Sequence, residues 1–204
     1  MSEEDLMKCH DVLYLASQSS RRQELLTEMK IPFKVVASSY RERWCRKTAP
    51  EILTVRHALG KAHRAELPKT ARFVLGGDTI VWNQGHGLGK PKTRGEALRM
   101  LRGMVGKKHA VYTGLAILDR KMGTVLTGCA KTEVWMKPVS ESWLEKYVDE
   151  IHPYDKAGAY AIQARLKIVR KISGSYSNVV GLPKELLRKM LKEIFAEAKV
   201  SSRI

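Results

Sequence analysis

The sequence is poor in cysteine and has no long hydrophobic run, and each shortage excludes a class of protein. Its 204 residues contain only three cysteines, widely spaced and odd in number, which excludes a disulfide framework and indicates a reduced environment. No apolar run approaches the roughly 18 residues of a membrane span. The acidic residues 1–10 lack the apolar core of a secretory signal. We therefore expect a cytoplasmic protein with no membrane partner.

Positive charge is what the sequence has in excess. Lysine and arginine number 37 against 21 acidic residues, a formal net charge of +16 at pH 7. Such a balance favours a polyanionic partner, which is nucleic acid, an anionic membrane or a phosphorylated small molecule. The charge is spread along the chain without a basic tail, and aromatic residues make up only 7%. Because nucleic-acid-binding sheets combine basic and aromatic side chains, nucleic acid is the less favoured partner.

Apolar patterning predicts an α/β fold with a mixed sheet, because strand-like and helical segments alternate around a β-rich middle region. We assign residues 1–10 to a leader and residues 11–204 to a single domain. Thr48 and Ser140 are the predicted N-caps of their helices. Predicted strands lie at 12–16, 33–37, 73–76, 79–82, 110–118, 124–135 and 167–172, and predicted helices at 21–29, 50–66, 96–104, 140–149 and 183–199.

A first motif with chemical potential lies between the first predicted strand and helix, where Ser17, Arg21 and Arg22 stand in a polar turn. Free N–H groups at a helix N-terminus attract anions, and the arginine fork suits phosphate. An ordinary helix cap with solvated arginines explains the same residues. The turn alone therefore leaves both interpretations open.

Asp78 carries the second motif, Gly76-Gly77-Asp78-Thr79, at a break between two predicted strand pieces. An acid among strand-forming residues is costly unless it is paired, binds a metal or lies at the mouth of a site. This favours a general base or a Mg²⁺ ligand over a turn aspartate.

Glycine-rich residues 85–91 predict a flexible loop that ends in Lys90. The segment is not a P-loop, because Gln84 replaces a required glycine and Pro91 replaces the required serine or threonine. Residues 153–163 and 174–183 combine small, aromatic and amide residues, which suits a base pocket or close backbone packing.

A metal site built from histidine or cysteine is not indicated. Cys9-His10 has no second pair, and His57 and His63 are six residues apart rather than four.

Taken in order, these motifs resemble the Maf family, the septum formation inhibitor homologues, which are nucleoside triphosphate pyrophosphatases. The strings SxSxRR, GxDT, LGKP, KAGAYxIQ and GSYxNVVGLP occur between about Leu13 and Phe195, nearly the whole chain. The resemblance implies an elongated mixed β-sheet with flanking helices, similar to inosine triphosphatases, and an active-site cleft between two lobes. It also implies cleavage of the α–β phosphoanhydride to a monophosphate and pyrophosphate with Mg²⁺, Mn²⁺ or Co²⁺.

The resemblance further implies roles for residues of this sequence. Asp78 is the preferred candidate to orient or deprotonate the attacking water and Glu42 to bind the metal, although the two roles can be exchanged. The expected metal ligands are therefore Glu42 and Asp78. The expected catalytic residues are Asp78, Glu42, Lys61 and Lys90, and the expected substrate-binding residues are Ser17, Arg21, Arg22, Thr79, Lys156 and Gln163.

The Asp-Thr pair and KAGAYxIQ resemble the branch acting on dTTP and UTP rather than the branch acting on 7-methyl-GTP. We therefore expect a house-cleaning enzyme for dTTP, UTP and modified pyrimidine nucleotides. Homodimers are common in the family, so a homodimer is one assembly that the resemblance allows.

Two other functions stay open, a weakly active or inactive homologue that binds nucleotides and a nucleic-acid-binding protein in cell-division control.

The tripeptide Ser202-Arg203-Ile204 is close to the peroxisomal address SKL, so a peroxisome-like organelle is an alternative location.

Overall fold

The structure is a computed structural model that describes residues 12–43 and 48–201. The predicted leader at residues 1–10 and the tripeptide Ser202-Arg203-Ile204 lie outside the described residues. None of the helices in the described part of the chain is long and apolar enough to cross a membrane.

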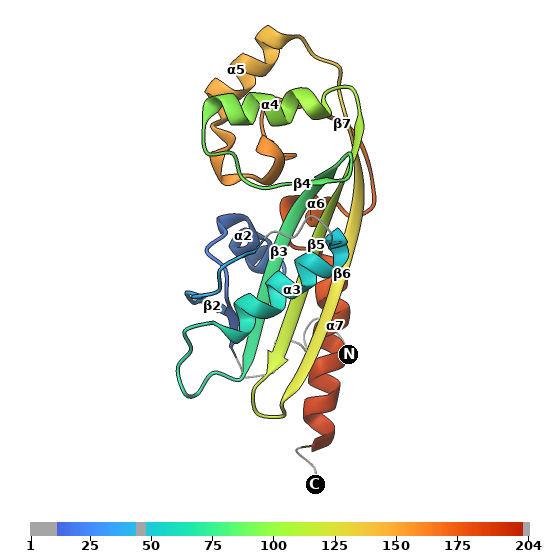
Figure 1. The fold of residues 1–204 in the computed structure, drawn as a ribbon. Helices are drawn as coiled ribbons and strands as arrows, with labels where there is room; N and C mark the ends of the chain where they lie inside the picture. Colours follow the sequence, from blue (N-terminus) through green and yellow to red (C-terminus); the bar gives the residue numbers. More distant parts are fainter. Residues whose placement is uncertain (1–11, 44–47, 202–204) are drawn as a thin grey trace.

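A seven-stranded mixed sheet runs along the molecule (Figure 1). Its order is β2-β1-β3-β5-β6-β7, and β4 pairs with β3 off this path. The β1 strand pairs in parallel with β2 and β3, whereas the remaining pairs are antiparallel. The strands are β1 (Leu13–Leu15), β2 (Phe33–Val35), β3 (Phe73–Asn83), β4 (His86–Leu88), β5 (Lys108–Asp119), β6 (Thr124–Met136) and β7 (Val169–Ser173). The predicted α/β fold with an elongated mixed sheet is confirmed.

Helices flank both the middle and one end of this sheet. In Figure 1, α4 and α5 lie together at one end, while α2, α3 and α7 accompany the rest of the long strands. The helices are α2 (Ser20–Glu28), α3 (Pro50–His63), α4 (Arg94–Met104), α5 (Glu141–Ile151), η1 (Pro153–Asp155), η2 (Ala157–Ala159), α6 (Tyr176–Val180) and α7 (Lys184–Ser201).

The two predicted N-caps have different outcomes. The Ser140 hydroxyl accepts a hydrogen bond from the backbone N–H of Trp143 at 3.2 Å, so this cap is confirmed. Thr48 is wrong, because Ala49 occupies the N-cap of α3 and Pro50 begins the helix. Proline at this position loses no helical hydrogen bond and has a suitable φ, so α3 begins without a side-chain cap.

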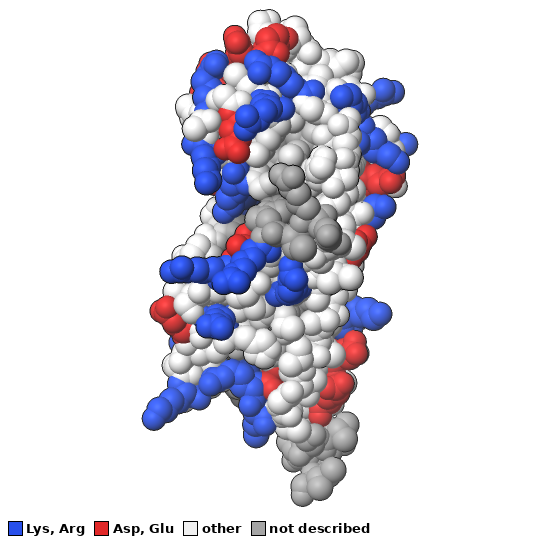
Figure 2. Space-filling model, in the orientation of Figure 1, with Lys and Arg blue, Asp and Glu red and all other residues white. Residues whose placement is uncertain are grey.

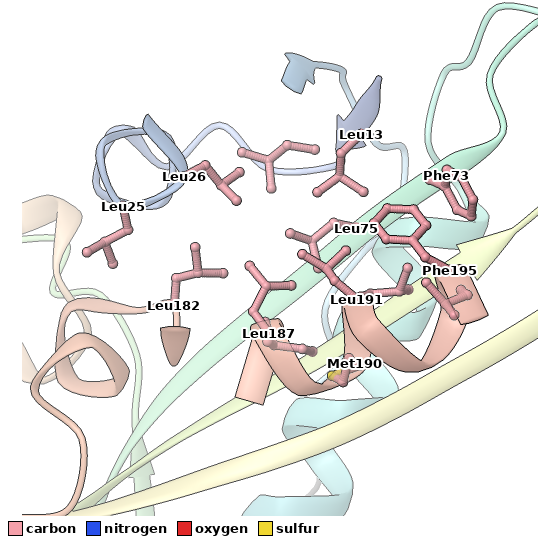
Figure 3. Close-up of a cluster of buried hydrophobic side chains, with 14 of the residues drawn as sticks. Leu13, Leu25, Leu26, Phe73, Leu75, Leu182, Leu187, Met190, Leu191 and Phe195 are labelled. Carbon is pink, nitrogen blue, oxygen red and sulfur yellow. The ribbon is translucent and has the colours of Figure 1, made fainter. Parts of the chain in front are cut away.

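The two larger of three hydrophobic clusters in the described residues lie at opposite ends of the same long strands. The first joins α2, β1 and the start of β3 to α7, whose apolar side chains pack into it (Figure 3). The second joins α4, α5 and η2 to the end of β3 and to β6. Phe73 and Leu75 of β3 belong to the first core and Val81 to the second. We refer to the parts around these cores as the first lobe and the second lobe.

The β3 strand is continuous from Phe73 to Asn83, so the predicted break around the acid is wrong. Asp78 pairs with Gly114 in the ladder with β5 and is only 5% exposed. The strand does not need to break because hydrogen bonds from another element satisfy the buried carboxylate, as described below. The predicted loop at residues 85–90 is also corrected. Residues His86–Leu88 form β4, joined to β3 by a two-residue turn in which Gln84 and Gly85 both have positive φ.

Two glycines allow α3 to lie directly on the sheet. A Cβ atom on Gly76 would lie 2.0 Å from the carbonyl oxygen of Ala58, and one on Gly114 would lie 2.3 Å from the carbonyl carbon of Thr54. No larger side chain fits at either position. This contact brings the side chains of α3 against the middle of β3.

Candidate active site

The site lies along an unpaired stretch of one edge of β3. On this edge β1 pairs with residues Phe73–Leu75 and β4 pairs with residues Val81–Asn83, while β5 occupies the other edge. Residues 76–80 therefore face a gap in the sheet between the two lobes. A cavity of about 290 Å³ opens there, and Asp78 and Thr79 both line it.

This cavity gathers nine of the ten predicted site residues. It is lined by Arg21, Arg22, Glu42, Lys61, Asp78, Thr79, Lys90, Lys156 and Gln163. Ser17 lines a neighbouring cavity of about 310 Å³, which shares Arg21, Arg22, Lys61 and Lys90 with the first. Figure 2 shows lysine and arginine side chains on both sides of the narrow middle of the molecule. The arrangement suits a polyanionic ligand.

Arg22 forms the buried floor between the two cavities. Its guanidinium donates to the carbonyl of Gly181 at 2.9 Å, the hydroxyl of Ser17 at 2.8 Å and the hydroxyl of Thr79 at 3.0 Å. Burial lowers the pKa of Arg22, and the charge of Asp78 opposes this effect. Because these bonds use the fork of the guanidinium, Arg22 holds the segments that follow β1 and α6 against the middle of β3.

Arg21, by contrast, reaches across to the second lobe. It donates to the Asp155 carboxylate at 2.6 Å and to the Asp155 carbonyl at 3.1 Å. Lys156 contacts the same carboxylate. Burial raises the pKa of Asp155, but the bonds from Lys156 and Arg21 lower it overall. The Asp155 carboxylate thus pairs with two of the cationic side chains that line the cavity.

A cluster of charged groups surrounds Asp78. The Lys61 ammonium lies 2.6 Å from Asp78 Oδ1 and 2.6 Å from Glu42 Oε1, so it bridges two carboxylates. His57 Nδ1 lies 3.0 Å from Asp78 Oδ2. Burial alone would raise the pKa of Asp78, but the bond from His57 and the charge of Lys61 lower it overall. The carboxylate is therefore ionised near neutral pH.

His57 is the residue that sequence reasoning missed. It is 0% exposed, and its spacing from His63 gave no sign of a functional role. A signal was present, because His57 precedes Lys61 by four residues and therefore lies on the same face of α3. A histidine on the sheet-facing side of a helix, one turn from a site lysine, marks a polar contact with that site.

The donor atoms fit a divalent cation. One atom each of Glu42, His57 and Asp78 lies within 4.8 Å of the others. Two carboxylates suit Mg²⁺ or Mn²⁺, whereas an added imidazole would favour a later transition metal. The residues present are thus able to hold the metal that the sequence motifs imply.

Part of the cavity lining is apolar and suits a base. Val111, Ala161, Ile162 and Val179 line it together with Gln163. Tyr160 also lines it, and its hydroxyl lies 2.8 Å from Nε2 of the buried His109, whose pKa burial lowers to about 4. The backbone N–H of Gly158 donates to the carbonyl of Gly89 at 3.0 Å, so the LGKP and KAGAY strings are joined directly.

Comparison with known proteins agrees with the motifs. Residues 12–194 match the family described as Maf-like protein. A dTTP/UTP pyrophosphatase of Geotalea uraniireducens (strain Rf4) is 42% identical over 179 residues, covering 87% of this chain and 92% of the relative. The dTTP/UTP pyrophosphatase of Hydrogenovibrio crunogenus is 41% identical and covers 89% of this chain and 95% of its own. That of Bacillus velezensis is also 41% identical, with coverages of 91% and 98%. This chain therefore belongs to the Maf-like protein family.

Proposed function

We propose that this protein hydrolyses the α–β phosphoanhydride of dTTP, UTP and related modified pyrimidine nucleotides, releasing a monophosphate and pyrophosphate. The observation that carries the proposal is the pair Asp78 and Glu42, bridged by Lys61 in a cavity lined with further cations. The names of relatives about 40% identical support the choice of substrate. The apolar residues that line the cavity with Gln163 accept the base, and the basic residues accept the phosphates.

Charge neutralisation is the main contribution of the basic residues. The triphosphate is a polyanion, and Arg21, Lys90 and Lys156 line the cavity that would receive it. Preorganised cations that face developing negative charge lower the barrier of phosphoryl transfer. Before substrate binds, Asp155 occupies Arg21 and Lys156. The phosphates therefore compete with Asp155 for these two side chains.

The environments of the two carboxylates support exchanging the roles that the motifs first favoured. Both oxygens of Asp78 contact donors, and its lowered pKa makes it a weak base. Glu42, whose side chain is 42% exposed, contacts Lys61 and lines the cavity. Glu42 is thus the better candidate to orient the attacking water, and Asp78 is the better candidate for a fixed ligand.

Asp78 and Glu42 would hold the divalent metal, with Mg²⁺, Mn²⁺ and Co²⁺ as the candidates. When bound, the metal supplies positive charge at the phosphates. The Lys61 ammonium lies between the two carboxylates and offsets their mutual repulsion. The carboxylates can therefore stay close together before a metal binds. A cytoplasmic location, a house-cleaning role and a homodimer stay predictions.

The test is a pyrophosphate assay with purified protein, Mg²⁺ or Mn²⁺, and a panel of dTTP, UTP, a 5-modified UTP, 7-methyl-GTP and ATP. We expect equal amounts of pyrophosphate and monophosphate, with dTTP and UTP turned over fastest. Asp78→Asn is expected to lose this activity, and Asp149→Asn is its matched control, because Asp149 is an exposed aspartate paired with Arg94 in the second lobe. If the wild-type protein releases no pyrophosphate from any nucleotide, the enzymatic proposal is wrong. Salt-sensitive oligonucleotide binding without hydrolysis would instead favour a nucleic-acid-binding protein.

A further inference from the structure

His57 is a wholly buried polar residue to which the proposed chemistry assigns no role. It lies in α3 and is 0% exposed. A buried imidazole is costly unless its nitrogens find partners. Its two partners are the Asp78 carboxylate and the backbone carbonyl of Arg43. An ionised carboxylate and a carbonyl can only accept hydrogen bonds, and a neutral imidazole donates from only one of its nitrogens. The charged carboxylate is the stronger and the nearer acceptor, so Nδ1 is assigned as the donor.

The ring of His57 connects the two segments that carry the acids. Nδ1 lies 3.0 Å from Asp78 Oδ2 on β3, and Nε2 lies 3.2 Å from the carbonyl oxygen of Arg43. Arg43 directly follows Glu42 in the sequence. One imidazole therefore touches one carboxylate and the backbone next to the other.

The segment that carries Glu42 is also docked on α3 beside this ring. The Tyr40 and His57 ring centroids are 5.9 Å apart. Tyr40 lies so close to Gly60 that a Cβ atom there would be 2.2 Å from its ring. Since α3 itself is held against β3 by Gly76, the helix acts as a rigid support for both acids.

The contact with His57 also gives the two oxygens of Asp78 different partners. His57 takes Oδ2, whereas Oδ1 contacts Lys61, which in turn contacts Glu42. Rotation of the carboxylate about its χ2 axis would break both contacts. The hydrogen bond from Nδ1 of His57 therefore fixes the direction in which Asp78 Oδ1 points, which is toward Lys61 and Glu42.

We propose that His57 is a positioning residue for the active site, whose Nδ1–H holds Asp78 so that Oδ1 is presented to the divalent cation beside Glu42. This inference rests on the proposed function in one respect, the assumption that Asp78 and Glu42 hold the divalent cation. Hydrogen-bond partners of metal-ligating carboxylates tune affinity, and their loss typically weakens binding or activity by about 10- to 100-fold.

The first experiment observes the hydrogen directly and needs no substrate. A long-range ¹H–¹⁵N spectrum of the imidazoles, with His57→Asn used to assign the signal, is expected to show a protonated Nδ1 for His57. An Nδ1 without hydrogen overturns the inference, while leaving the proposed enzymatic function intact.

The second experiment compares side chains that keep or lose this donor. An asparagine amide reaches the position of Nδ1, whereas a glutamine amide reaches that of Nε2. Mn²⁺ binding to the nucleotide-free protein, measured by electron paramagnetic resonance, is expected to weaken by about 10-fold or more in His57→Gln and His57→Leu. His57→Asn is expected to keep an affinity close to that of the wild type. His63→Leu is the matched control, since His63 is exposed at the end of the same helix.

The two amide variants decide the outcome even if His57→Leu does not fold. Equal Mn²⁺ affinity in all variants overturns the inference, and so does equal weakening in His57→Asn and His57→Gln, because a direct metal ligand or a packing role would produce that pattern. If the wild-type protein releases no pyrophosphate while Nδ1 is protonated and the variants differ as expected, the proposed function fails and the role of His57 stands.

Discussion

Asp78→Asn is the substitution for which the structure supports the most detailed prediction. The carboxylate is 5% exposed and accepts hydrogen bonds from Lys61 at 2.6 Å and from His57 at 3.0 Å. A hydrogen bond to a charged group contributes about 1.5–3 kcal/mol. The amide keeps one acceptor oxygen and Lys61 keeps Glu42, so we expect a loss of stability of about 2 kcal/mol. For a domain of this size that lowers Tm by about 4–8 °C.

Activity is expected to fall far more than stability. The substitution removes a negative charge and a metal-ligating oxygen from a preorganised site, so we expect kcat for dTTP to drop by about 100-fold or more. The assay is pyrophosphate release at saturating dTTP and Mg²⁺, with circular dichroism to confirm that the variant is folded. A folded variant with wild-type kcat would refute the assignment of Asp78 to the chemistry.

The pH dependence of stability provides an independent check on the same carboxylate. The pKa of Asp78 is lowered from its ordinary value of 3.8 in the folded protein. Its contribution is therefore complete above about pH 5 and disappears as the pH falls through the lower, folded-state pKa. We expect the difference in Tm between the wild type and Asp78→Asn, measured in a metal chelator, to be constant from pH 5 to 7 and to narrow below pH 3.8. A difference that grows toward acid pH would contradict the charge interactions described here.

Three further predictions concern other parts of the site. Asp155→Asn releases Arg21 and Lys156 from their carboxylate partner, so steady-state kinetics should show a lower KM for dTTP; a higher KM would mean that Asp155 assists binding rather than competing with the phosphates. Gly76→Ala introduces a Cβ atom 2.0 Å from the carbonyl of Ala58 and should displace α3, lowering Tm and kcat together; Gly95→Ala, at an open position on α4, is the control that should change neither. Removal of divalent ions with a chelator should abolish pyrophosphate release, and Mn²⁺ should restore it; activity that persists in the chelator would exclude a role for the cluster of Glu42, His57 and Asp78 in metal-dependent catalysis.

Local patterns in the sequence were sufficient for the fold class, for most elements and for nine of the residues that line the cavity. Helical and strand periodicities depend on residues close in the chain, so the helix predicted at 183–199 agrees with α7 at Lys184–Ser201. Motifs such as GxDT and LGKP identified most of the cavity lining, because the functional side chains of each motif lie within a few residues of one another.

Only the tertiary structure decided how these residues divide their work, because their partners come from distant segments. The sequence by itself suggested a break at Asp78; the strand is continuous because Lys61 and His57, from a helix more than a dozen residues earlier, satisfy the carboxylate. The sequence does not distinguish Arg22 from its neighbour Arg21. In the structure Arg22 is buried and donates to the carbonyl of Gly181, whereas Arg21 pairs with Asp155 across the cavity. Burial and long-range pairing set the free energy of a charged group, and neither quantity can be read from the residue types alone.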